Sequence, residues 1–162
     1  MYKVALFIGR FQPLHNGHVY SYKKALTIAE SVKIVIAKSN VWGTEDDPWH
    51  WRTRRAWVKK VFGQEAIVCP DNPSDAVWLR EVRKRAGKFD VVVSNNPWVL
   101  SIMKNAGIAT YETGLWKREE LEGIKIRKMM RKENPEWKLR VPEAVAREID
   151  VLAVHKGNPL GF

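Results

Sequence analysis

Residues 9–18, with the sequence GRFQPLHNGH, combine residue types that bind negatively charged oxygen. His15 and His18 are three positions apart, so they can converge on one group if the second lies on the first turn of a helix. A neutral imidazole offers one N–H donor, and Arg10 adds a planar, permanently charged fork. Gly17 lets a ligand or the backbone come close because no Cβ blocks the approach. This combination predicts a phosphate-binding site.

The segments on either side would place this motif at a strand-to-helix turn. An apolar run at residues 4–8 indicates a buried strand, and a helical pattern begins at about residue 17. A helix N-terminus leaves backbone N–H groups unpaired and carries the positive end of the helix dipole, so it holds an anion. Two other interpretations stay open. In the first, capping the helix is the sole role of the two histidines. In the second, they ligate a metal, although the chain has one cysteine and no HExxH motif.

Short apolar runs alternate with helical patterns along the chain. Strands are predicted over residues 4–8, 33–37, 66–69, 91–94 and 109–113. Helices are predicted over residues 17–30, 51–62, 74–86, 97–106, about 123–132 and 142–154. The alternation predicts an α/β fold with a doubly wound parallel sheet, whose ligands bind beyond the carboxyl ends of the strands. We expect one domain over residues 1–156 and a tail over residues 157–162 that contains glycine and proline. No GxGxxG motif is present, which argues against a dehydrogenase-type dinucleotide fold.

Composition and charge bound the function without deciding it. The single cysteine, Cys69, ends an apolar run and is typical of a small core residue in a reducing compartment. With no signal-peptide pattern and no transmembrane-length apolar stretch, we expect a cytoplasmic protein. The formal charge of +10 would attract nucleotides or nucleic acid. The basic residues of segment 80–88, however, also fit one solvated helix face.

The sequence GRFQPLHNGH resembles the signature of the HxGH nucleotidyltransferase superfamily. Its GRxQPxHxGH form is similar to that of archaeal-type nicotinamide mononucleotide adenylyltransferases. The likeness continues through DPW at 47–49, a tryptophan at 78, FDVVVSNNP at 89–97 and GIKIRKM at 123–129, and covers about residues 3–150. It implies a Rossmann-like fold, ATP as one substrate and nicotinamide mononucleotide, or its nicotinic acid analogue, as the other. It also implies a homo-oligomer, often a hexamer.

The resemblance also implies roles for individual residues. The catalytic residues would be His15, His18, Arg10 and Arg127. The nucleotide would be bound by Gly9, Arg10, Phe11, His18, Asn95, Gly123 and Arg127. We expect no metal site built by the protein alone, because Mg²⁺ is usually held by phosphates and water and would arrive with ATP.

The segment GIKIRKM departs from the family pattern. In the family this helix start carries a Ser/Thr-Gly-Thr-x-x-Arg type of motif, and here Glu122 and Ile124 occupy the hydroxyl positions. Backbone N–H groups would still bind phosphate, but Glu122 could repel it. Arg127 could alternatively be one of several basic residues on a solvated helix.

The acceptor nucleotide would be bound by Arg54, Trp78 and Asp75. Aligned on the DP pair, Arg54 is expected to contact phosphate, with an exposed helix turn as the alternative, and Asp46 stands where a family member has a basic residue. Trp78 would stack on the cationic pyridine ring, although core packing is the ordinary fate of a helical tryptophan. Asp75, one helical turn earlier, would accept hydrogen bonds from the carboxamide, although an acidic residue at a helix start is equally explained by the dipole.

The sequence therefore predicts an adenylyltransferase that joins ATP and nicotinamide mononucleotide to give NAD and pyrophosphate. One alternative is another HxGH nucleotidyltransferase with a different phosphate acceptor or with CTP as donor. Another is a catalytically weak protein that binds nucleotides or, as a less favoured partner, nucleic acid.

Overall fold

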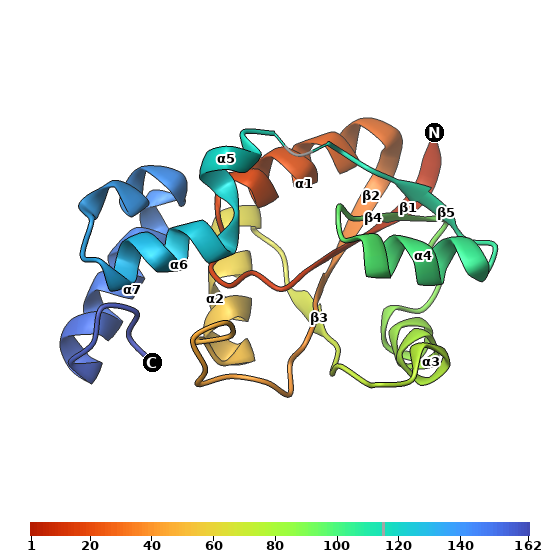
Figure 1. Ribbon diagram of the computed structural model, residues 1–162. Coiled ribbons are helices and arrows are strands. Elements are labelled where there is room, and N and C mark those ends of the chain that lie inside the picture. Colours follow the sequence, from red (N-terminus) through yellow and green to blue (C-terminus); the bar gives the residue numbers. More distant parts are fainter. Residues whose placement is uncertain (115) are drawn as a thin grey trace.

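A five-stranded parallel sheet forms the centre of the computed structural model, which describes residues 1–114 and 116–162 (Figure 1). Its strands pair in the order β3-β2-β1-β4-β5. They are β1 (Tyr2–Gly9), β2 (Ala29–Ile36), β3 (Ala66–Val68), β4 (Val91–Val93) and β5 (Ala109–Tyr111). The prediction of a doubly wound parallel sheet is confirmed. After β3 the strand order turns back to the other side of β1, so the ends of β1 and β4 border the position where such folds bind ligands.

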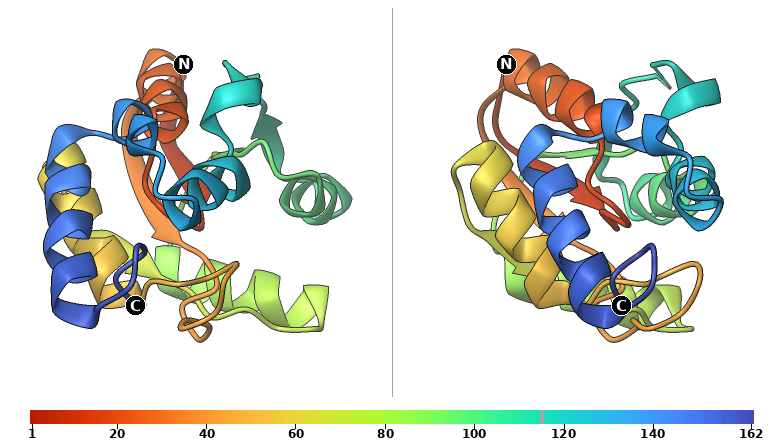
Figure 2. Two further views of the ribbon diagram at one scale, coloured as in Figure 1. Left: turned by 60° about the vertical axis from the view of Figure 1, so that its left-hand side comes forward. Right: turned by 90° about the vertical axis from the view of Figure 1, so that its left-hand side faces the viewer.

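Helices cover both faces of the sheet (Figures 1 and 2). They are α1 (Asn16–Ile28), α2 (Trp51–Phe62), α3 (Asp75–Ala86), α4 (Pro97–Asn105), α5 (Arg118–Leu121), α6 (Gly123–Arg131), a 3₁₀ helix (Pro135–Arg140) and α7 (Glu143–Lys156). Successive side chains of a strand point to opposite faces. Accordingly Ala5 and Phe7 of β1 pack in a core that contains residues of α1, α2, α6 and α7, whereas Leu6 and Ile8 pack in one formed with α3 and α4.

The predicted bounds were least accurate at the α1–β2 junction. The first helix ends at Ile28 instead of residue 30, and β2 begins at Ala29 instead of residue 33. The first half of β2 is more polar than an isolated apolar run, so periodicity misses it. It is nevertheless held in the sheet, because β2 pairs with β1 from Tyr2–Ala29 to Gly9–Ile36.

The carboxyl-terminal residues pack against the domain. Leu160 is buried, and its carbonyl oxygen accepts a hydrogen bond from the indole Nε1 of Trp49 at 2.8 Å. None of the helices in the described residues combines the length and the apolar character that a membrane span needs.

Candidate nucleotide-binding site

A cavity of about 900 Å³ opens over the carboxyl ends of β1, β2 and β4. Gly9 and Arg10 come from the end of β1, Lys38 from the end of β2, and Asn95 from the end of β4. Residues at the starts of α1 and α6 also line this cavity. A mixed polar and apolar cavity of this size, at this place in the fold, suits a nucleotide.

His15 and His18 lie at the start of α1 with their ring centroids 3.8 Å apart. The backbone N–H of Gly17 donates to Nδ1 of His15, and the backbone N–H of His15 donates to Nδ1 of His18, both at 3.1 Å. The two rings therefore cap the helix, as one interpretation of the sequence held, and both also line the cavity. Because each Nδ1 accepts a hydrogen bond, the proton of each neutral ring is on Nε2. Each histidine thus keeps one N–H donor besides its capping contact.

Both imidazoles are held in the neutral form. Burial lowers the pKa of His15 to about 3, and the positive charge of Arg127 adds to this effect. Burial also lowers the pKa of His18 well below its usual value, with smaller contributions from His15 and Arg10. Removing an imidazolium from water is costly, so the neutral ring is favoured.

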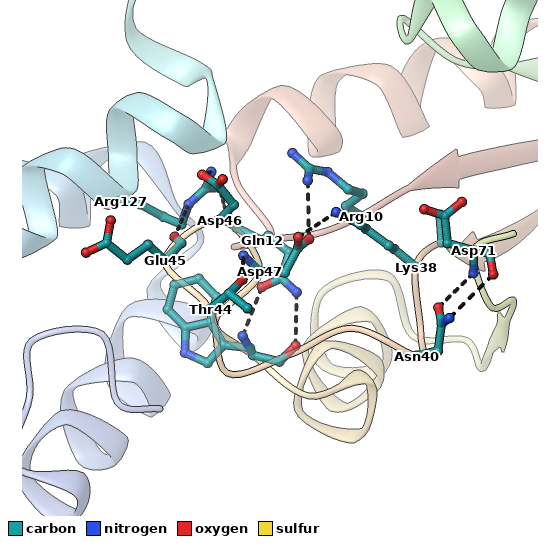
Figure 3. A network of polar contacts seen from close by, with 12 residues as sticks. Arg10, Gln12, Lys38, Asn40, Thr44, Glu45, Asp46, Asp47, Asp71 and Arg127 are labelled. Carbon is teal, nitrogen blue, oxygen red and sulfur yellow. Dashed lines mark hydrogen bonds and ion pairs between the residues drawn. The ribbon is translucent and has the colours of Figure 1, made fainter. Parts of the chain in front are cut away.

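Arg10 and Lys38 reach the cavity from neighbouring strands and share one carboxylate (Figure 3). Arg10 donates through Nη1 to Oδ1 of Asp47 at 3.2 Å, and Lys38 donates through Nζ to Oδ2 at 2.7 Å. The Asp47 side chain is 3% exposed, whereas those of Arg10 and Lys38 are 45% and 30% exposed. The carboxylate is therefore buried behind two cations that still face solvent.

Arg127 of α6 is turned toward two loops. Its Nη1 donates to the carbonyl oxygen of Gln12 at 2.6 Å, and its Nε donates to that of Glu45 at 3.1 Å (Figure 3). Burial lowers the pKa of the guanidinium from its usual value. A Cβ at Gly123 would lie 3.0 Å from Nη1 of Arg127 and 3.1 Å from the carbonyl oxygen of Gln12, so glycine permits this close approach. Arg127 lines the cavity while it joins α6 to the loops after β1 and β2.

A second, smaller cavity of about 440 Å³ lies beside the first. The loops after β2 and β3 and the start of α4 line it with Asn40, Asp71, Asp75 and Trp98. Trp98 is 39% exposed, and its indole Nε1 donates to Oδ1 of Asp75 at 3.1 Å. Asn40 joins the two loops through hydrogen bonds with the backbone of Asp71 (Figure 3). The cavity combines an exposed aromatic ring with carboxylate and amide groups.

The sequence model of the cytidylyltransferase-like family matches residues 6–155. The nicotinamide-nucleotide adenylyltransferase of Picrophilus torridus is 35% identical over 153 residues, which cover 90% of this chain and 89% of that protein. The chain belongs to this adenylyltransferase family. The corresponding enzyme of Pyrobaculum aerophilum is 30% identical over 158 residues, with coverage of 93% and 89%. Family membership, predicted from GRFQPLHNGH, is confirmed.

A solved structure supports the fold assignment. The bifunctional NMN adenylyltransferase/ADP ribose pyrophosphatase of Francisella tularensis superposes with a TM-score of 0.75 at 19% sequence identity. The match covers 93% of this chain and 50% of the other, so the chain spans about half the length of that bifunctional protein.

For this member of the family, the structure corrects the expectation for Arg54. Its side chain is fully buried and donates to the carbonyl oxygens of Arg10, Ala37 and Lys38 at 2.8 to 3.2 Å. Burial lowers its pKa to about 10. Instead of facing a substrate phosphate, Arg54 joins the ends of β1 and β2 from beneath the cavity.

The structure also corrects the expectation for Trp78. It is 1% exposed and belongs to the core between the sheet and α3, the alternative that the sequence analysis left open. Its ring lies 4.8 Å from that of Trp98, centroid to centroid. The exposed ring at the small cavity is therefore Trp98. Asp75, in contrast, does line that cavity.

The remaining predicted residues lie at the large cavity. Gly9 allows a close approach, because a Cβ there would lie 3.1 Å from the ring of Phe11. Phe11 packs its buried ring 4.6 Å from that of His18, centroid to centroid. Asn95 uses its side chain to hold the ends of β4 and β5 together, donating to Oγ1 of Thr113 at 2.9 Å. Gly9 and Phe11 thus shape the cavity around the histidines.

Sequence reasoning missed Lys38, Asp47, Asn40, Asp71 and Trp98 as site residues. Position offered one signal: Lys38 directly follows the predicted strand 33–37, at the edge of the sheet where ligands bind. Nothing local distinguishes Trp98 from the seven other tryptophans of the chain, eight in all.

Proposed function

We propose that this protein joins ATP to nicotinamide mononucleotide, forming NAD and pyrophosphate. The observation that carries the proposal is the pair of neutral imidazoles with their Nε2–H donors at the start of α1, beside the guanidinium of Arg10 in one cavity. Hydrogen-bond donors at a helix N-terminus, with a cation beside them, suit a reaction in which negative charge moves onto a phosphate leaving group.

The reaction is a single in-line displacement. An oxygen of the acceptor 5′-phosphate attacks the α-phosphorus of ATP, and the bond from that phosphorus to the α,β-bridging oxygen breaks. No proton has to be transferred by the protein, which agrees with the low pKa of both histidines. His15 and His18 donate hydrogen bonds to the phosphates as charge builds on pyrophosphate, and Arg10 neutralises it.

The start of α6 would bind the far end of the triphosphate. Glu122, its N-cap residue, makes no side-chain capping hydrogen bond, so the first N–H groups of the helix are not capped by that carboxylate. Gly123 and Arg127 border the same cavity. This site relies on backbone donors where the family pattern has hydroxyl groups.

Mg²⁺ would come with ATP and be held mainly by phosphate oxygens and water. Among the described residues, no three His, Cys, Asp or Glu side chains form a group that could hold a metal ion. Asp46 lines the cavity, so it offers a carboxylate oxygen of the kind that suits magnesium. When bound, the ion would neutralise part of the triphosphate charge.

The pyridine ring of the acceptor would occupy the small cavity. Trp98 offers an exposed indole face to a cationic ring, and Asp75 offers a carboxylate acceptor to its carboxamide. Nicotinic acid mononucleotide carries a carboxylate at that position, so Asp75 would repel it.

We also propose that the protein works as a homo-oligomer in the cytoplasm. Helix α7 exposes Val151 and Val154 at 67% and 87%, and Leu139 nearby in sequence is 79% exposed, which provides apolar surface for a second copy to cover. Light scattering of the purified protein would give the mass in solution.

The activity is tested by turnover with ATP or CTP and a panel of acceptors. We expect NAD and pyrophosphate from ATP with nicotinamide mononucleotide, at a higher kcat/KM than from any other pair. Preference for CTP or for another phosphate acceptor would contradict the proposal. A protein that binds ATP tightly without turnover would instead support a binding function.

A further inference from the structure

The loop after β2 connects the two cavities. Lys38 lines the large cavity and Asn40, two residues later, lines the small one. An acceptor with its ring in the small cavity and its phosphate at the α-phosphorus of ATP in the large cavity would extend between this loop and the start of α4, where Pro97 lines the large cavity and Trp98 the small one. Its phosphate would then lie near the only cationic side chain that this loop contributes to the lining of either cavity, among the residues that the structure describes.

The backbone of this loop is held from several sides. Lys38 has a φ of 55°, a left-handed conformation that a residue with a Cβ seldom adopts. Arg54 donates to the carbonyl oxygens of Ala37 and Lys38, and Asn40 is bonded to the backbone of Asp71. These hydrogen bonds, those of the buried Arg54 above all, therefore fix the direction in which the Lys38 side chain leaves the backbone.

Asp47 then fixes the end of that side chain. Its two carboxylate oxygens bind different cations, Nζ of Lys38 and Nη1 of Arg10, so the two positive groups are held side by side (Figure 3). The cluster keeps a net positive charge, because two cations share one carboxylate. An ammonium has three N–H donors, and the bond to Asp47 uses one.

We propose that Lys38 binds the 5′-phosphate of the acceptor nucleotide, and that Asp47 is the positioning residue that keeps Lys38 and Arg10 in place for the two phosphate groups. This inference rests on the proposed function. The attacking phosphate and the triphosphate repel each other, and a cation on the acceptor side reduces that repulsion during approach. Arg10, beside the histidines, acts on the ATP side.

If Lys38 served only as the ion-pair partner of Asp47, different results would be expected. In that case, removing the ammonium would lower stability and would affect both substrates equally. If Lys38 binds the acceptor phosphate, the loss falls on the acceptor alone and depends on the presence of its phosphate.

The first experiment compares Lys38→Met with Lys38→Arg by steady-state kinetics. We expect Lys38→Met to raise KM for nicotinamide mononucleotide about tenfold or more, the value for one charge-assisted hydrogen bond, with KM for ATP changed less than about threefold. Lys38→Arg should recover most of the loss. The matched control is Lys60→Met, which removes another ion-paired lysine, bound to Glu148 on the outer surface.

The second experiment measures binding without turnover by calorimetry. Nicotinamide riboside has the ring and ribose of the acceptor and lacks its phosphate. We expect Lys38→Met to weaken binding of nicotinamide mononucleotide about tenfold or more and to leave binding of the riboside nearly unchanged. Asp47→Asn should weaken binding of the mononucleotide and also lower kcat, because Arg10 loses its partner as well.

The outcomes separate this inference from the function on which it rests. If the unmodified protein forms no NAD, the proposed function fails. If it forms NAD but Lys38→Met has the same KM values as Lys60→Met, the assignment of Lys38 is wrong. The assignment is also wrong if Lys38→Met weakens binding of the riboside as much as binding of the mononucleotide. Equal increases in KM for both substrates would also overturn it.

Discussion

Two helix starts face the large cavity, and they are built from different groups. At the start of α1, His15 and His18 cap the helix with Nδ1 and keep Nε2–H donors. At the start of α6, Glu122 makes no side-chain capping bond, and Arg127 is bonded to loop carbonyls. The comparison teaches that the N-terminus of a helix can offer an anion hydrogen-bond donors from side chains, as at α1, or mainly its own backbone N–H groups, as at α6. We therefore expect the chemistry to depend on α1 and the shape of the cavity to depend on α6.

The largest effect is expected at α1. His18→Ala should lower kcat about a hundredfold or more, because a donor to developing phosphate charge contributes roughly 3–4 kcal/mol. KM for ATP should change less. His155→Ala, at an exposed position in the last turn of α7, serves as the control in the same assay. A His18→Ala enzyme with near-normal kcat would remove the histidine from the chemistry.

The protonation of the two histidines gives the next test of the comparison. With a folded-state pKa of about 3, His15 should stay neutral in the free protein throughout the range in which an ordinary histidine titrates. The unfolded chain binds this proton near pH 6.5 and the folded chain does not. The free energy of unfolding should therefore fall as pH decreases from about 6.5 toward 3. Imidazole nitrogen shifts measured by NMR would check this, and a midpoint for His15 near 6.5 would contradict it.

At α6 we expect substitution of Arg127 to affect the free energy of unfolding more than the rate of the reaction. Arg127→Ala leaves the carbonyl oxygens of Gln12 and Glu45 without this donor and should lower the free energy of unfolding by about 2–3 kcal/mol. Urea unfolding measures it. Arg131→Ala, at an exposed position of the same helix, should change stability little. Equal stability of the two variants would show that Arg127 does not hold the loops.

Restoring hydroxyl groups at α6 would make the two helix starts more alike. Glu122→Ser combined with Ile124→Thr should lower KM for ATP about threefold to tenfold, since it removes a repelling carboxylate and adds donors. Glu122→Gln removes the charge alone and should give a smaller part of the gain. An unchanged KM in both variants would mean that the triphosphate does not extend to the start of α6.

The smallest effect is expected at the small cavity, away from both helix starts. The unmodified enzyme should have a higher kcat/KM for nicotinamide mononucleotide than for its acid analogue. Asp75→Asn should lower the ratio of these two kcat/KM values by about threefold. Glu81→Gln, farther along α3 and paired with Arg85, is the control. Equal use of both substrates by the unmodified enzyme would remove Asp75 from the acceptor site.

Local patterns along the chain were sufficient for the architecture. Alternating apolar runs and helical segments predicted all five strands and their parallel arrangement, because each element must bury one face against its neighbours. Short-range spacing was also sufficient for the histidine motif, since a strand end, a turn and the first helical turn are contiguous. The polar first half of β2 was missed, because only its pairing with β1 keeps it extended.

The site beyond the motif depended on contacts between distant residues. Arg54 was expected at a phosphate and Trp78 at the pyridine ring, yet packing buries the arginine against loop carbonyls and the tryptophan in the core. Lys38 and Asp47 are nine residues apart in one loop, and the fold brings both to Arg10.

By itself, then, the sequence determined the fold class and the pair of histidines at a helix start, because these follow from periodicity and from spacing within one turn. It also indicated the family, through the resemblance of GRFQPLHNGH to a known signature. The tertiary structure alone decided that Lys38 and Trp98 line the cavities while Arg54 and Trp78 are buried. Exposure depends on how helices and loops from different parts of the chain pack together, and no local pattern encodes that arrangement.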